Sequence, residues 1–193
     1  MVRYPDDLSL LEARNLFFRD AKLGSDSGYR DRWVRVESKP VPFYFPNWPA
    51  RVAAAHLHDL HHIAAEYETD WPGEAEIAAW EIASGCARYH AAWVLNLGGF
   101  GAGLVVAPRR LFRAFLRGRC AKTNLYKSGF DESRLNDITV EMLRDQLGLR
   151  ALPSARATDV GLFLLWCIPS VLAWLPLPFL TVILLWLILR AKF

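Results

Sequence analysis

The sequence lacks several features that define familiar classes of protein. Its 193 residues include only three cysteines, Cys86, Cys120 and Cys167, which lie far apart without metal-ligand spacing. They exclude a disulfide framework and a cysteine-type zinc site, and they favour a reducing compartment. No apolar segment opens the chain, so we expect no secretory signal. Acidic residues among the first twelve positions also argue against a mitochondrial transit peptide.

Acidic residues are missing from one long stretch. None lies between Glu81 and Asp131, whereas the first 81 residues are acidic overall. A long segment that carries only basic charges favours an anionic partner, either lipid headgroups or nucleic acid. A solvated helix face is the simpler alternative. No nucleic-acid reader motif is present, so we expect no nucleic-acid partner. The basic residues of this band are Arg88, Arg109, Arg110, Arg113, Arg117, Arg119, Lys122 and Lys127.

The long hydrophobic run of the chain extends from Val160 to Leu189 and contains no charged residue. Bilayer insertion is the ordinary explanation for a run of this length, and a hydrophobic core helix is the alternative. We therefore divide the chain into a helical domain, residues 1–155, and a membrane-inserted hydrophobic tail, residues 156–193.

Prolines decide how the tail is expected to enter the membrane. Pro176 and Pro178 split the run into arms that are each shorter than the roughly 20 residues of a spanning helix. Basic residues flank both ends, which favours placing both on the cytoplasmic side. A re-entrant helical hairpin satisfies both features, and a single kinked transmembrane helix from Cys167 to Leu189 is the alternative. We expect the cytoplasmic face of a bacterial inner membrane, or the mitochondrial inner membrane of a eukaryote.

Period-2 patterns are scarce before the tail, so the domain is predicted to be all-α. Apolar spacing predicts an amphipathic helix over residues 8–21, and an alanine-rich composition predicts another over 51–68. The four prolines and four aromatic residues of segment 39–49 predict a structured loop. Asp70 is expected to cap a following helix that runs from Gly73 towards Leu97.

Three later segments complete the helical prediction. The small residues of Gly98–Gly103 are expected to interrupt an apolar stretch and to permit close approach of a helix or of lipid. Residues 109–121 predict a basic amphipathic helix, which beside a membrane tail indicates an interfacial helix. Asp137 is expected to cap a final helix that runs to Leu147 and ends at Gly148.

The segment that carries chemistry is HDLHH at residues 58–62, followed after a Trp-Pro turn by Glu74. Positions four apart share a helix face, so His58 and His62 point the same way. That spacing suits one metal ion, and a chain reversal at the turn would bring Glu74 near the imidazoles. Two imidazoles and up to two carboxylates, from Asp59 and Glu74, suit zinc, Fe(II) or Mn. A solvent-facing, histidine-rich helix without a metal is the alternative.

Other histidine-based metal enzymes fit the chain poorly. Membrane desaturases need several histidine boxes, and only five histidines are present. Carboxylate-bridged di-iron bundles need two Glu-x-x-His pairs, and the chain has none. HD phosphohydrolases need a further upstream histidine and a distant aspartate, and zinc metalloproteases place glutamate where Asp59 stands.

The metal motif resembles HDxxH-x11-E, the zinc motif of the coenzyme Q (ubiquinone) biosynthesis protein 4 family. The similarity includes Gly73 before the glutamate and Glu81 seven residues after it. The segment RGRCAKTNLYKSGFDESRLNDITVEMLRDQLGL, residues 117–149, is also similar to the C-terminal region of that family. The hydrophobic tail and the histidine at position 61 depart from the family pattern.

The resemblance implies an all-helical, membrane-associated fold with zinc at His58, Asp59, His62 and Glu74. It implies work on polyprenylated hydroxybenzoate intermediates and links the protein to oxidative decarboxylation, which replaces the ring C1 carboxyl with hydroxyl. A non-catalytic lipid-binding scaffold that organises quinone-biosynthesis enzymes is the alternative. The expected partners are the polyprenylated aromatic lipid, membrane phospholipids, other quinone-biosynthesis enzymes and a second copy in a homodimer. No catalytic residue is assigned.

Overall fold

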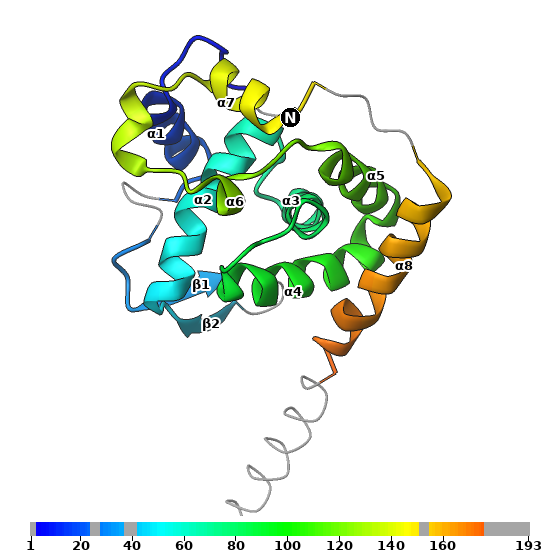
Figure 1. Ribbon diagram of the computed structural model, residues 1–193. Helices are drawn as coiled ribbons and strands as arrows, with labels where there is room; N and C mark the ends of the chain where they lie inside the picture. The colour runs from blue at the N-terminus through cyan, green and yellow to red at the C-terminus, as the bar shows by residue number, and fades with distance from the viewer. Residues whose placement is uncertain (1–2, 24–27, 37–41, 151–154, 176–193) are drawn as a thin grey trace, which may run out of the picture.

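The computed structural model describes residues 3–23, 28–36, 42–150 and 155–175. Over these residues the protein is mostly helical, as predicted, with one small antiparallel β-hairpin (Figure 1). In chain order the elements are α1 (Leu10–Asp20), β1 (Trp33–Val36), β2 (Phe43–Pro46), α2 (Pro49–Ala65), α3 (Trp71–Ser84), α4 (His90–Val106), α5 (Pro108–Cys120), α6 (Leu125–Ser128), the 3-10 helix η1 (Glu132–Asn136), α7 (Val140–Leu147) and α8 (Ala157–Leu172).

Local sequence signals fix several helix ends. Ser9 and Glu12 form a capping box that starts α1, because each side chain bonds the other residue's backbone N–H. The Asp70 side chain caps α3 by accepting from the Gly73 N–H at 2.8 Å, as predicted. At α7 the predicted cap, Asp137, is wrong: Thr139 accepts from Met142 and begins the helix.

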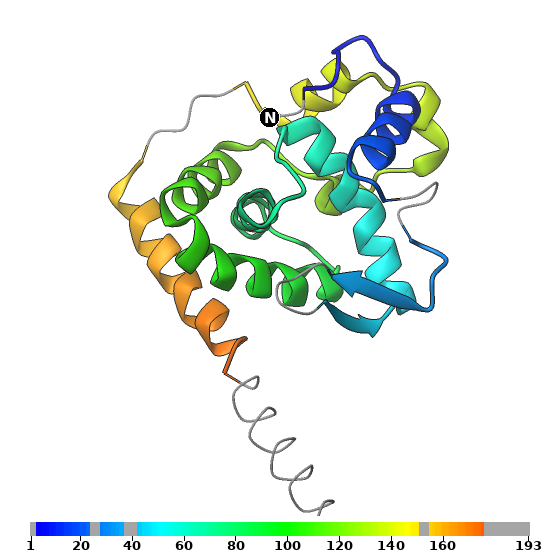
Figure 2. The same ribbon diagram turned by 180° about the vertical axis from the view of Figure 1, so that it is seen from behind.

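Helix α3 lies at the centre of the domain, with α2, α4 and α5 around it (Figures 1 and 2). Ile77 and Trp80 of this helix belong to a buried cluster shared with α1, α2 and α7. Ala75, Ala79 and Ile82 belong to a second cluster shared with α4 and α5. The Glu81 side chain of α3, which points towards α2, is therefore enclosed by the core.

Glycines permit the close approach of helices to α3. A Cβ at Gly103 of α4 would lie 2.7 Å from the Ala75 Cβ, and one at Gly118 of α5 would lie 2.8 Å from the Ala83 Cβ. Close helix packing by the small residues of α4 is thus confirmed. These small residues lie within one continuous helix, α4.

Two further predictions fail in detail. The helix expected from Gly73 to Leu97 is two helices, because the chain breaks at Gly85, with φ +90°, and at Ala87, with φ +45°. The loop expected over residues 39–49 contains strand β2, which pairs with β1 so that Trp33 faces Pro46.

The basic helix α5 forms where predicted, but its apolar side does not lie at an interface. Leu111 and Phe115 are fully buried, and Leu116 is 7% exposed. Leu111 and Phe115 pack inward because α3 and α4 supply a matching apolar surface. The interfacial prediction for this helix is therefore wrong.

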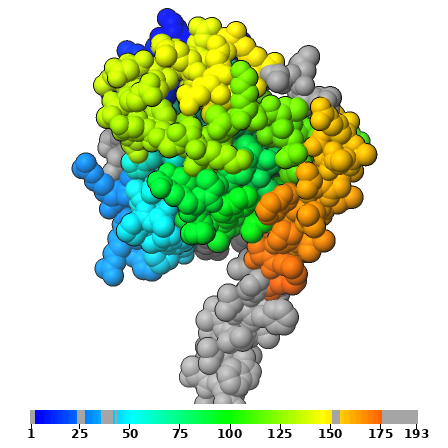
Figure 3. Space-filling model, viewed as in Figure 1, coloured from blue at the N-terminus to red at the C-terminus, as the bar shows by residue number. Residues whose placement is uncertain are grey.

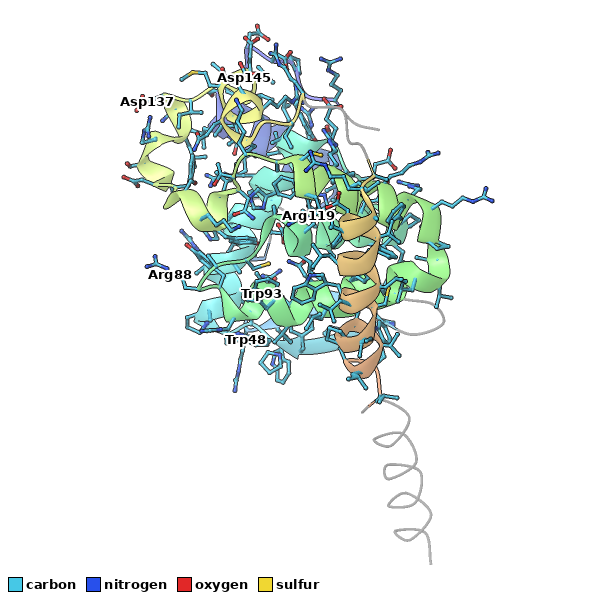
Figure 4. The ribbon with its side chains drawn as sticks, turned by 45° about the vertical axis from the view of Figure 1, so that its right-hand side comes forward. Trp48, Arg88, Trp93, Arg119, Asp137 and Asp145 are labelled. Atoms are coloured by element: carbon cyan, nitrogen blue, oxygen red, sulfur yellow. The ribbon has the colours of Figure 1, made fainter. Side chains whose placement is uncertain are left out.

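Helix α8, which begins the predicted tail, lies along the edge of the domain beside α4 and α5 (Figures 1 and 3). In Figure 4 it runs to the right of the labelled Trp93 and Arg119. The Trp93 ring stacks on Trp166 at 5.3 Å between centroids, and Arg119 Nε lies 3.2 Å from Asp159 Oδ1. The first part of the tail is thus packed onto the domain.

The other side of α8 carries a stripe of large apolar residues that are between 51% and 59% exposed. They are Leu164, Leu165, Ile168, Val171 and Leu172. Within the described ranges, no helix is both long enough and apolar enough to span a bilayer. The turn expected at Pro176–Pro178, and with it the choice between hairpin and single span, falls outside the described residues.

Candidate metal centre

The corner between α2 and α3 returns the chain onto its own histidines. Glu66 adopts a left-handed conformation, with φ 62°, and ends α2. Asp70 then starts α3, four residues before Glu74. Gly73 is required at this corner, since a Cβ there would lie 2.6 Å from the Glu68 carbonyl carbon. The first turn of α3 therefore brings Glu74 beside α2.

Three of the four predicted ligands converge. One ligand atom each from His58, His62 and Glu74 lies within 4.8 Å of the others. The two Nε2 atoms are 3.1 Å apart, and each is 3.5 Å from a Glu74 carboxylate oxygen. His62 is buried, and the other two are partly exposed. The chain reversal expected at the Trp-Pro turn thus does bring Glu74 to the imidazoles.

The hydrogen bonds of the two imidazoles leave both Nε2 lone pairs directed at the centre. His62 Nδ1 lies 3.0 Å from the Tyr67 carbonyl oxygen, so the Nδ1–H donates to it. His58 Nδ1 lies 3.1 Å from Glu81 Oε1 and donates to that carboxylate. Two lone pairs facing each other at 3.1 Å repel unless a cation lies between them. A proton or a metal ion supplies that cation.

Asp59 is not brought to the centre. It is 7% exposed, and its Oδ2 accepts a hydrogen bond of 2.5 Å from the Tyr29 hydroxyl. Its position next to His58 on α2 turns the carboxylate about 100° away from the face of His58 and His62. The structure therefore groups three predicted ligands and places the fourth in a separate contact.

Glu81 is the functional residue to which sequence reasoning assigned no role. It lies two turns after Glu74 on α3 and is fully buried. Its spacing of seven from Glu74 places it on the same helix face, which is the signal that the sequence offers. Its hydrogen-bond donors are His58, His61, Asn96 and Tyr126.

Mutual electrostatics shift the pKa values of these groups. Burial alone lowers the pKa of His58, but the carboxylates of Glu81 and Glu74 outweigh it and raise that pKa well above the ordinary value. Burial raises the pKa of Glu74 and of Glu81, but the neighbouring histidines outweigh it and lower both. Burial lowers the pKa of His61 against the opposing effect of Glu81. The centre therefore stabilises ionised carboxylates of Glu74 and Glu81 next to a cation, either a proton or a metal ion.

The donor set fits a divalent metal ion. Two imidazole nitrogens and a carboxylate are the protein ligands of many catalytic zinc sites, which keep one position for water or substrate. The same donors suit Fe(II) and Mn. The partial exposure of His58 and Glu74 leaves this side of the centre open for such an exogenous ligand.

The other histidines have separate surroundings. His56 Nδ1 lies 2.6 Å from Glu132 Oε1, and its ring stacks on Tyr29 at 3.9 Å. His90 begins α4 and is exposed. Neither belongs to the group of three ligands.

Comparisons of the chain with protein-family models, with curated proteins and with solved structures find no match. The centre is therefore assigned from its geometry, from the chemistry of its donors and from the motif that predicted it.

Proposed function

We propose that the protein is a membrane-associated, metal-binding protein of ubiquinone biosynthesis that acts on polyprenylated hydroxybenzoate intermediates. The observation that carries the proposal is the convergence of His58, His62 and Glu74, three residues of the HDxxH-x11-E motif, on one point. The tautomers of the two histidines also support a metal site. Both Nδ1–H groups donate to acceptors, so both Nε2 atoms are free to bind a metal ion. Zinc is the proposed ion, and the donors also suit Fe(II) or Mn.

The proposed reaction replaces the ring C1 carboxyl with hydroxyl. Its balance is ArCOOH + H₂O → ArOH + CO₂ + 2H⁺ + 2e⁻, so an electron acceptor such as dioxygen must take part. A bound divalent ion supplies Lewis acidity towards the substrate carboxylate or a neighbouring phenol oxygen. The chain's own contribution is to hold two neutral imidazoles and the Glu74 carboxylate on one side, which leaves the opposite side open to the aromatic headgroup.

Membrane association is supported by α8. Its exposed apolar stripe, from Leu164 to Leu172, continues in sequence into an uncharged run that reaches Leu189. Burying such a stripe in lipid is favourable by about 25 cal/mol for each Å² removed from water. We place the protein on the cytoplasmic face of a bacterial inner membrane, or on the mitochondrial inner membrane of a eukaryote, where its lipid substrate and partner enzymes lie.

The test is turnover by the purified, zinc-loaded full chain in phospholipid vesicles. The substrate is a polyprenylated 4-hydroxybenzoate labelled with ¹³C at the carboxyl group, supplied under air. Mass spectrometry is expected to detect the C1-hydroxylated product and labelled CO₂. Glu74→Gln removes a ligand and is expected to abolish turnover. The matched control is Glu76→Gln, also on α3, whose carboxylate instead pairs with Arg110 at 2.5 Å.

A scaffold role predicts a different result. If Glu74→Gln loses the metal but restores quinone synthesis in a deletion strain, the protein organises other enzymes and does not catalyse the step. Absence of product from the zinc-loaded and iron-loaded wild type would contradict the enzymatic proposal directly.

A further inference from the structure

We infer that Glu81 is a positioning residue for the metal centre, which holds His58 in its metal-binding orientation and balances part of the cation's charge. This inference rests on the metal site proposed above and assigns a role to a residue outside the ligand set. Four hydrogen bonds to one fully buried carboxylate carry it.

The connection to the ligand is direct. Glu81 Oε1 lies 3.1 Å from His58 Nδ1, and the opposite ring nitrogen, Nε2, faces His62 and Glu74. Metal-ligating histidines usually donate their second N–H to a carboxylate or a carbonyl, which fixes the ring and raises its basicity. Glu81 fills this role for His58, as the Tyr67 carbonyl does for His62.

The carboxylate is itself held in place from three sides. His61 of α2 donates to Oε1 at 2.6 Å, and its tautomer is fixed because its Nε2 accepts from the Leu125 N–H at 2.9 Å. Asn96 of α4 and Tyr126 of α6 donate to Oε2 at 2.6 Å and 3.1 Å. A carboxylate held in this way has little freedom to move, so it transmits a fixed orientation to the ring of His58.

Charge balance gives an independent reason for a second carboxylate. With neutral imidazoles on both ligand histidines, the formal charges of Glu74, Glu81 and one divalent ion sum to zero. A buried carboxylate without a cation is costly, and uncompensated charge in a buried site is strongly destabilising. Glu81 therefore favours a divalent ion at the centre, although it does not touch that ion.

A purely structural role for Glu81 makes a different prediction. In that case the residue only ties α2, α4 and α6 together, and its loss lowers stability without changing the affinity of correctly folded protein for a metal. A positioning role changes the affinity itself. Measurement of zinc affinity on folded protein therefore separates the two roles.

The experiment compares wild type, Glu81→Gln and Glu76→Gln in the full chain. The dissociation constant for Zn²⁺ is measured by competition with a chromophoric chelator, and folding is checked by circular dichroism. We expect Glu81→Gln to weaken zinc binding by about 10- to 100-fold, and Glu76→Gln to leave it unchanged. The visible spectrum of the Co²⁺-loaded protein is expected to change in Glu81→Gln alone, because the ring of His58 is no longer held.

Each result has one consequence. If folded Glu81→Gln binds Zn²⁺ with the same dissociation constant as the wild type, this inference is overturned and the proposed metal site is unaffected. A wild-type protein that binds no Zn²⁺ overturns the proposed site and the inference with it. If Glu81→Gln does not fold, Tyr126→Phe decides, because it removes one donor to Glu81 Oε2. Weaker zinc binding in folded Tyr126→Phe supports the positioning role, and unchanged binding overturns it.

Discussion

The position of α3 against α5 depends on Gly118, so we predict that Gly118→Ala destabilises the fold. A Cβ at this position would meet the Trp80 carbonyl oxygen and would lie 2.8 Å from the Ala83 Cβ and 3.0 Å from the Trp80 Cα. Because two of these atoms belong to the main chain of α3, a rotamer change cannot relieve the overlap. One helix must move away from the other.

The expected size follows from two opposing contributions. Overpacking of a close-packed core costs about 1–3 kcal/mol, and a main-chain contact belongs at the upper end of that range. Alanine in place of a helical glycine raises the free energy of unfolding by about 1 kcal/mol, because alanine has the higher helix propensity. The net loss in the free energy of unfolding is therefore about 2 kcal/mol. For a chain of this length that loss lowers the melting temperature by about 4–8 °C.

Gly98→Ala is the matched control. Gly98 also lies within a helix, α4, but a Cβ there has no atom within 4 Å. The same substitution is expected to stabilise the protein by about 1 kcal/mol, because the helix-propensity gain has no opposing clash. Urea unfolding followed by far-ultraviolet circular dichroism measures both variants. Equal effects at the two positions, or a stabilised Gly118→Ala, would refute the packing of α5 on α3.

Three further predictions concern the metal centre and the tail. Burial lowers the pKa of His58, but Glu81 and Glu74 outweigh it and raise that pKa well above 6.5. Because zinc must displace the proton of His58, the zinc affinity falls as the pH falls, and this fall begins above pH 6.5. Calorimetric titrations are expected to show a loss approaching tenfold per pH unit, whereas a flat profile between about pH 8 and 6 would contradict the shift. Asp59→Asn is expected to lower the zinc content much less than Glu74→Gln, because the Asp59 carboxylate bonds to the Tyr29 hydroxyl and not to the metal. Metal analysis of the two variants checks this, and equal losses of zinc would show that Asp59 is a ligand. An environment-sensitive fluorescent amino acid in place of Ile168 is expected to shift to the blue on addition of phosphatidylglycerol vesicles, and the same probe in place of Met142, also exposed, is expected not to shift. Identical responses at the two positions would argue against a lipid-facing stripe on α8.

The features that sequence could predict are local ones. His58 and His62 are four residues apart, and that spacing fixes a common helix face whatever surrounds it. The Asp70 cap, the apolar spacing of α1 and the alanine-rich composition of α2 are likewise local signals in the sequence. These predictions are confirmed because tertiary packing had little to add to them.

The features that sequence could not predict depend on contacts between distant segments. Asp59 turns to Tyr29, thirty residues earlier in the chain, and nothing in the motif indicates that partner. The importance of Glu81 depends on Tyr126, which arrives from α6 after two intervening helices. Leu111 and Phe115 of α5 have the periodicity of an interfacial helix, and only the apolar surfaces of α3 and α4 place them in the core.

The central claim is that one divalent ion binds between His58, His62 and Glu74, and X-ray absorption spectroscopy of the zinc-loaded protein tests it most directly. The predicted spectrum has a first shell of nitrogen and oxygen only, at about 2.0–2.2 Å, with the outer scattering of two imidazoles. In Glu74→Gln this signature is expected to disappear together with the bound zinc. Sulfur in the first shell, scattering from fewer than two imidazoles, or an unchanged spectrum in Glu74→Gln would contradict the claim.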